Sequence, residues 1–274
     1  MRRPAVAGKF YPADPERLKR QVEEGFLHPL GPGELPKGTG REREVVGAIV
    51  PHAGYIYSGP EAAAVYHELA KERKPKTMVI MGPNHTGHGS AMAISKEAWL
   101  TPFGEVQVDL EGADMLLDIC PVLSHDEAAH RYEHSIEVQL PFLQYIYEDF
   151  QFIPISFGTQ DLESCMEVAS ALAVLKDALI LASSDFTHYE SQEAAARKDG
   201  EAIKHILAFD EEGFVRAVYG QGFTICGHGP IAACLAASKR LGARRAELLK
   251  YGTSGEILGD FTQVVAYAGM VFKK

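Results

Sequence analysis

The sequence predicts an α/β fold, a three-layer α/β/α domain with a largely parallel or mixed central sheet. Short, β-branched apolar runs such as VVGAIV at Val45–Val50 and TMVIM at Thr77–Met81 are typical of strands that are buried on both faces. Segments of helical period alternate with these runs along the whole chain, as in a sheet covered by helices. The 274 residues are 46% hydrophobic, enough to fill a sizeable core. We expect a single domain over residues 1–274.

Strands are predicted where apolar runs are short, and helices where apolar residues recur every three to four positions. The predicted strands are Val45–Val50, Thr77–Met81, Ala91–Ile94, Glu105–Val108, Phe152–Phe157, Ala178–Ala182, Glu247–Tyr251 and Gln263–Phe272. The predicted helices are Pro15–Phe26, Pro60–Arg73, Gly112–Ile119, Asp161–Leu175, Glu193–Leu207, Glu211–Val218 and Ile231–Leu241. The spacing from Ile136 to Tyr147 is also helical, with a kink expected at Pro141. Residues 4–12 should lie against the body of the domain, and residues 28–44 should form a surface loop.

Composition argues against several classes of protein. The net charge of -10 disfavours binding to the phosphate backbone of nucleic acid. No apolar run approaches the roughly 18 residues of a membrane span, and Met1-Arg2-Arg3 leads into polar sequence rather than a signal-peptide core. The four cysteines lack CxxC spacing, which favours reduced thiols. We therefore expect a cytoplasmic protein that binds neither nucleic acid nor membranes.

Polar side chains follow three of the predicted buried strands. His52 comes directly after the first, His85 after the second, and Asp185 and His188 after Ala178–Ala182. In open α/β sheets, ligands bind at the edge where such strands end, so these four side chains are expected to share one crevice. A single histidine is as often a hydrogen-bonded structural residue as a ligand, but the recurrence favours a shared metal site.

Two further residues are candidates for the same crevice. Cys226 in TICGHGP lies close to the start of a predicted helix, where a thiol loses its proton more readily, so it can ligate a metal or act as a nucleophile. The alternative is that a cysteine is only a small buried apolar residue, and we interpret Cys120, Cys165 and Cys234 in this way. His134 in YEHSIE either faces the crevice or belongs to a polar segment that caps the following helix.

Two other motifs lack the flanking sequence that their functions require. The segment GHGPIA at Gly227–Ala232 matches a dinucleotide-binding pattern, but the acidic residue that should end a second strand, Glu247, would begin its strand instead. A hydrolase triad is suggested by Ser183 or Ser184 with Asp185 and His188, yet the GxSxG elbow is absent from the chain. A phosphate-binding GxxxxGK[ST] loop is absent too.

Taken together and in order, several blocks of this sequence resemble the Memo family. These blocks are PAVAGKFYP, PHAGYIYSGP, GPNHTG, LTPFGEVQVD, EHSIEVQLPFL, SSDFTHY and TICGHGP. The family is similar in fold to the class III extradiol ring-cleaving dioxygenases, which hold non-haem Fe(II) with two histidines and a glutamate. The resemblance implies a fold more firmly than a reaction.

The resemblance also implies roles for individual residues. His52 and His85 match the two imidazole ligands, and Cys226 falls where the dioxygenases have their glutamate. Asp185 and His188 match residues that line the same pocket, with His188 at the position of the acid/base histidine. Two histidines and a carboxylate suit Fe(II), whereas two histidines and a thiolate also suit copper or zinc.

The leading hypothesis from the sequence is a redox-active protein with iron or copper held by His52, His85 and Cys226. Asp185 would be a further metal ligand or would orient the other groups. His188 would move a proton, and His134 would hold the hydroxyl of a small substrate such as a phenol. One alternative is a peptide- or protein-binding module with a vestigial metal pocket, and another is a zinc-dependent hydrolase. The resemblance adds a radical-SAM system as an expected partner of microbial members.

Overall fold

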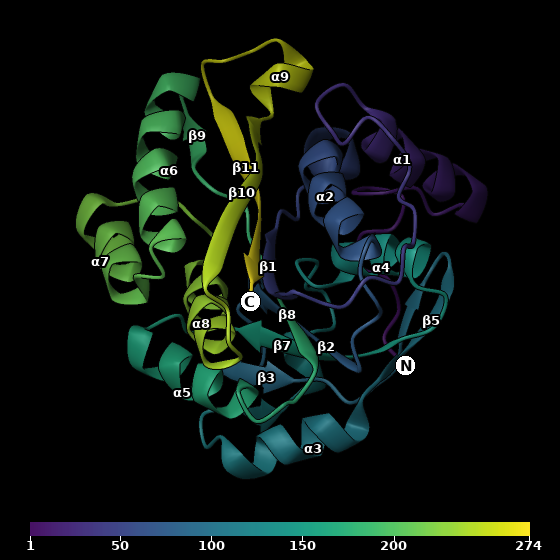
Figure 1. Cartoon of the computed structure of the whole chain (residues 1–274), viewed down its shortest axis with the longest axis vertical. Helices are drawn as coiled ribbons and strands as arrows, with labels where there is room; N and C mark the ends of the chain where they lie inside the picture. Colours follow the sequence, from purple (N-terminus) through teal and green to yellow (C-terminus); the bar gives the residue numbers. More distant parts are fainter.

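The computed structural model describes residues 1–274 and has one mixed sheet between layers of helices (Figure 1). The strands follow the order β10-β11-β1-β8-β2-β7-β3-β6, with β4, β5 and β9 attached beside this path. Their bounds are β1 Val45–Val50, β2 Thr77–Pro83, β3 Met92–Ile94, β4 Trp99–Thr101, β5 Gly104–Val108, β6 Ser124–His125, β7 Gln151–Phe157, β8 Ala178–Ser183, β9 His188–Glu190, β10 Arg245–Thr253 and β11 Val264–Lys273. The predicted α/β class with a mixed central sheet is confirmed.

Helices cover both faces of the sheet, with α5 to α8 on one side and α1, α2 and α4 on the other (Figure 1). Their bounds are α1 Pro15–Leu27, α2 Tyr55–Ala70, α3 Leu110–Ile119, α4 Leu140–Ile146, α5 Leu162–Leu172, α6 Gln192–Leu207, α7 Glu211–Gln221, α8 His228–Arg240 and α9 Gly255–Leu258. None of these helices has both the length and the apolar character needed to cross a bilayer.

The centre of the sheet is parallel. β8 lies between β1 and β2 and runs parallel to both, with Ile180 opposite Gly47 and Ala178 opposite Thr77. All residues of these three strands are buried, as their continuous apolar sequences predict. Their carboxyl ends therefore meet at one edge of the sheet, which brings together the polar residues that follow them.

Two prolines do not act as the sequence predicts. Helix α2 begins at Tyr55 rather than Pro60, so Pro60 lies inside it and removes one backbone hydrogen bond. Packing of the buried face of α2 outweighs this loss, because most helix stability in proteins comes from tertiary contacts. Pro141 does not kink a helix, since it lies in the first turn of α4, where its missing N–H has no helical partner.

Short elements were missed because their sequences are too brief to show a period. These elements are β4, β6, β9 and α9, together with two 3-10 turns at Glu127–Ala129 and Glu137–Gln139. The most relevant is β9, which begins at His188 and pairs antiparallel with β11. This pairing fixes the main chain of a predicted site residue against the C-terminal strand. Helix α8 also begins earlier than expected, at His228.

Candidate metal centre

Three imidazoles meet at the carboxyl edge of the parallel strands. The ring centres of His52 and His85 are 5.2 Å apart, and that of His134 lies 5.4 Å from His52 and 4.7 Å from His85. One ring nitrogen from each histidine can be chosen so that all three lie within 4.8 Å of one another. This arrangement is a candidate site for a single metal ion, since imidazole nitrogens are common metal ligands.

The three rings open onto a cavity of about 530 Å³. Two other predicted residues, Asp185 and His188, also line it. The remaining lining residues come from the N-terminal segment, the start of α2, and β9 to β11, and they are Lys9, Phe10, Ala53, Gly54, Tyr57, Tyr189, Ser254, Leu258, Gln263, Val265 and Tyr267. A volume of this size is typical of a small-molecule site.

The hydrogen bonds of Ser183 fix the tautomer of His52. The Ser183 hydroxyl donates its single proton to the carbonyl of Ser135 at 2.6 Å and accepts a bond from Gln139 Nε2 at 2.8 Å. His52 Nδ1 lies 3.0 Å from the same hydroxyl oxygen, so it must be the donor. Burial lowers the pKa of His52 well below its usual value, and the neighbouring histidines lower it further. His52 is therefore neutral, with its lone pair on Nε2.

Cys226 lies beside that lone pair. Its Sγ is 3.2 Å from His52 Nε2 and accepts a hydrogen bond from the backbone N–H of Asp185 at 3.3 Å. The sequence predicts a readily ionised thiol here, but burial, reinforced by Asp185, raises the pKa of Cys226 instead. Without a cation nearby the group is a protonated thiol, so its expected role as a free nucleophile is wrong. A bound cation would favour the thiolate.

Glu133 holds His85 in place. Its Oε1 accepts a hydrogen bond from His85 Nδ1 at 2.9 Å, and Oε2 accepts the backbone N–H of the same residue. Burial alone would raise the pKa of Glu133, but the hydrogen bond and charge of His85 lower it to about 2. The carboxylate is therefore ionised and engages Nδ1 of His85, so Nε2 is the nitrogen that the unprotonated ring can offer to a metal. A histidine held by a carboxylate in this way is typical of metal ligands.

The same carboxylate also organises His134. Glu133 Oε1 accepts the backbone N–H groups of His134 and Ser135 at 2.8 and 2.9 Å. Burial lowers the pKa of His134 to about 4, so its ring is neutral at pH 7. Of the two interpretations of His134, the structure supports the one in which it faces the crevice. The role of Glu133 was missed, and its only sequence signal is a carboxylate directly before a histidine.

Asp185 lies on the loop that follows β8, and His188 begins β9 at the end of this loop. Asp185 Oδ1 accepts the backbone N–H of His52 at 2.8 Å, while Oδ2 lies 4.0 Å from His52 Nε2. Burial raises the pKa of Asp185 to about 6. His188 Nδ1 lies 2.7 Å from the carbonyl of Phe186 and 2.9 Å from that of Thr224, so Nδ1 carries a proton. The neutral form of His188 then has its lone pair on Nε2.

The whole sequence matches a known family. A sequence model described as Memo-like protein aligns with residues 2–271. The chain belongs to the Memo family. This confirms the resemblance drawn from the sequence blocks.

Archaeal members of the Memo family are close relatives over their full length. The chain is 48% identical over 280 residues to a MEMO1 family protein of Methanopyrus kandleri, covering 100% of this chain and 99% of the relative. It is 49% identical over 278 residues to one of Methanosarcina mazei, covering 99% and 98% of the two chains. The names of these relatives give a family and no reaction.

A solved structure supports the fold assignment. An uncharacterized protein from Escherichia coli K12 aligns with a TM-score of 0.55 and 12% sequence identity, covering 84% of this chain and 100% of that chain. At this identity the likeness concerns the fold alone. The chemistry of this Memo-family site is therefore argued from its own residues.

The N-terminal segment of this Memo-family chain is anchored beside the candidate metal centre by Glu137. This fully buried carboxylate accepts the backbone N–H groups of Ala5 and Val6 at 2.7 and 3.0 Å and the Tyr11 hydroxyl at 2.6 Å. It also pairs with buried Arg2 at 2.8 Å. Residues 4–12 thus lie against the body of the protein as predicted, and the PAVAGKFYP block is explained by this anchor.

We expect Glu137→Gln to lower the free energy of unfolding by about 1–3 kcal/mol, because it removes a charge that is hydrogen-bonded and paired in the interior. Urea denaturation of the purified protein measures this change. Exposed Glu148 has neither an ion pair nor a hydrogen-bonded side chain, so Glu148→Gln should stay within about 0.5 kcal/mol of the parent. Equal stability of the two variants would contradict the anchoring role.

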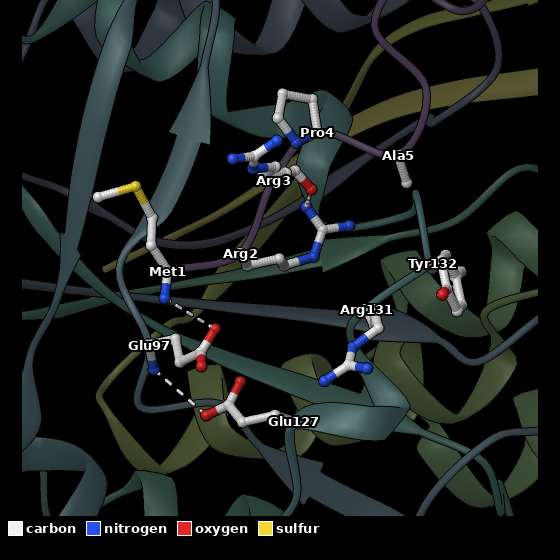
Figure 2. A pocket seen from close by; sticks show the side chains of 9 residues that line it. All are labelled: Met1, Arg2, Arg3, Pro4, Ala5, Glu97, Glu127, Arg131 and Tyr132. Carbon is white, nitrogen blue, oxygen red and sulfur yellow. Dashed lines mark hydrogen bonds and ion pairs between the residues drawn. The ribbon is translucent and has the colours of Figure 1, made fainter.

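A second cavity, of about 490 Å³, is lined by Met1 to Ala5 of the same N-terminal segment (Figure 2). Figure 2 shows Arg3 and Arg131 at this cavity and an ion pair of 3.1 Å between the Met1 amine and Glu97. None of the predicted site residues lines it. We therefore assign the candidate chemistry to the histidine-lined cavity alone.

Proposed function

We propose that this Memo-family protein binds one redox-active ion, iron or copper, and acts on a small substrate such as a phenol. The single observation that carries the proposal is the tautomer of His52 and His85. Both rings have Nδ1 engaged by a buried oxygen, so Nε2 is the nitrogen that the unprotonated ring can offer to a metal ion. Such preorganisation is expected of ligands and is not required of histidines that merely fill a core.

The donor atoms at hand fit this class of ion. His52 and His85 would supply two imidazoles, and either His134 or Cys226 would supply the third ligand, with Asp185 as a further oxygen donor or orienting group. Imidazole with thiolate suits copper, and imidazole with carboxylate suits iron. When bound, the ion would supply the electron exchange that these side chains cannot provide.

The remaining residues would handle the substrate. His188 lines the cavity with its Nε2 lone pair available, so it would take or return a substrate proton. His134 would hold a substrate hydroxyl if Cys226 completes the ligand set. Asp185 would keep His52 in place through the backbone bond that it accepts.

We expect His188→Gln to retain stoichiometric metal and to lose about 100-fold in turnover, because general acid–base catalysis contributes roughly 10²–10⁴-fold. Metal content is measured by elemental analysis after purification without added chelator, and turnover by oxygen uptake with a panel of simple phenols and catechols. His125→Gln is the matched control, since His125 is exposed and outside the cavity. Substoichiometric iron and copper in the parent protein would refute the proposal.

A zinc-dependent hydrolase is the second candidate, and the group of three imidazoles favours it. Three histidines with an open fourth position are a known ligand set of catalytic zinc. Stoichiometric zinc in the isolated protein, with ester or amide cleavage that His188→Gln abolishes, would favour this candidate. Peptide binding that survives complete metal removal would instead favour a non-catalytic binding module.

A further inference from the structure

Part of the cavity lining differs in character from the predicted ligands. It is apolar and aromatic, with side chains from the N-terminal segment, α2, β9, α9 and β11, namely Phe10, Tyr57, Tyr189, Leu258, Val265 and Tyr267. Lys9 is the only lysine or arginine among the lining residues. It is exposed and takes part in none of the ion pairs of the chain. The cavity therefore offers an unpaired ammonium beside an apolar surface.

The backbone that carries Lys9 is held firmly. The N–H groups of Lys9 and Phe10 both donate to the Val6 carbonyl, at 3.0 and 2.9 Å, and the Phe10 carbonyl accepts the N–H of Tyr55 at 2.8 Å. The Phe10 ring lies 4.7 Å from that of His134. Because consecutive Cα atoms are about 3.8 Å apart, Lys9 is placed within a side-chain length of a ring bound at the histidines.

We infer that Phe10 and Lys9 select the substrate, and that the substrate is a small aromatic compound carrying a carboxylate. This inference rests on the proposed function and names the class of substrate for the same site. The aromatic wall would pack against the ring, and Lys9 would bind the carboxylate at the end remote from the histidines. One ammonium matches a monoanion, whereas a phosphate dianion is usually bound by several donors.

Two probes of nearly equal shape test the charge preference. They are 3-(4-hydroxyphenyl)propionate and its primary amide, titrated into the metal-loaded protein by calorimetry at low salt. We expect the carboxylate to bind about three- to tenfold more tightly than the amide, the range for a partly exposed charge pair. Lys9→Met should bring the ratio close to one, and Lys9→Arg should restore it. Lys19→Met, an exposed lysine of α1 outside the cavity, should leave it unchanged.

Three results would overturn the inference. They are equal binding of the two probes to the parent protein, a ratio that survives Lys9→Met, and no binding of either probe at millimolar concentration. If the carboxylate still binds more tightly than the amide in Lys9→Met, the carboxylate is bound by the metal ion or by another group. Metal content is measured on each sample, so absence of iron and copper refutes the proposed function separately. The charge ratio can then still be measured on the metal-free protein.

Discussion

Replacing His52 with alanine is expected to lower the affinity for the bound ion more than about 100-fold, a larger loss than removal of a residue that only supports a ligand. His52 is buried, neutral and locked in one tautomer by Ser183, and its free Nε2 lies 3.2 Å from Cys226 Sγ. Its removal takes away one imidazole and leaves the thiol without its neighbour. His85 stays in place in this variant, because its ring is bonded to Glu133.

The readout is metal content together with thermal unfolding. An ion present at 100 times its dissociation constant stabilises the parent by about 2.7 kcal/mol, which raises the unfolding temperature of a chain of this size by roughly 5–10 °C. His52→Ala should show no such rise. His67→Ala, in α2 and outside the cavity, should respond like the parent. Full metal loading of His52→Ala would show that the ion binds elsewhere in the protein.

Glu133→Gln is expected to lower metal affinity about 10–100-fold while leaving every predicted ligand in place. The carboxylate keeps His85 Nδ1 protonated, and it raises the pKa of His85 against the opposing effect of burial. A glutamine can offer its carbonyl to His85, but its amide cannot accept the second backbone bond at Oε2. The ring would then be less firmly oriented and less basic.

Glu133→Gln should also lack the part of the free energy of unfolding that the ionised carboxylate contributes in the parent. The pKa of Glu133 falls from 4.5 to about 2 on folding, so the ionised group stabilises the parent at pH above 4.5 by about 3 kcal/mol, and this contribution is lost as the pH falls toward 2. Urea unfolding at pH 7 and pH 3, with calorimetric metal titrations, separates the two effects. Glu133→Gln with unchanged metal affinity would leave the carboxylate a purely structural role.

The sequence predicted the strands that end in His52, His85 and Asp185 for a physical reason. Strands buried on both faces, such as Val45–Val50, need continuous apolar sequence, and a polar residue directly after one stands out. That His52, His85 and Asp185 would meet followed from the rule that ligands bind where parallel strands end. The order β1-β8-β2, which makes them neighbours, had to come from the structure.

The supporting residues could not be predicted because their contacts are long-range. Glu133 lies 48 residues from His85, and Ser183 lies 131 residues from His52. Hydrogen bonds over such separations leave no period or spacing in the sequence. The same applies to Phe10, whose contact with His134 depends on the anchor at Glu137. Acidic and hydroxyl residues of this kind look like ordinary helix caps until the chain is folded.

The position of β11 links the stability of the sheet to the shape of the cavity. This strand lies between β10 and β1, pairs with β9 next to His188, and contributes Val265 and Tyr267 to the cavity. A substitution that loosens the pairing of β11 with either neighbour is therefore expected to distort the cavity wall as well as the sheet.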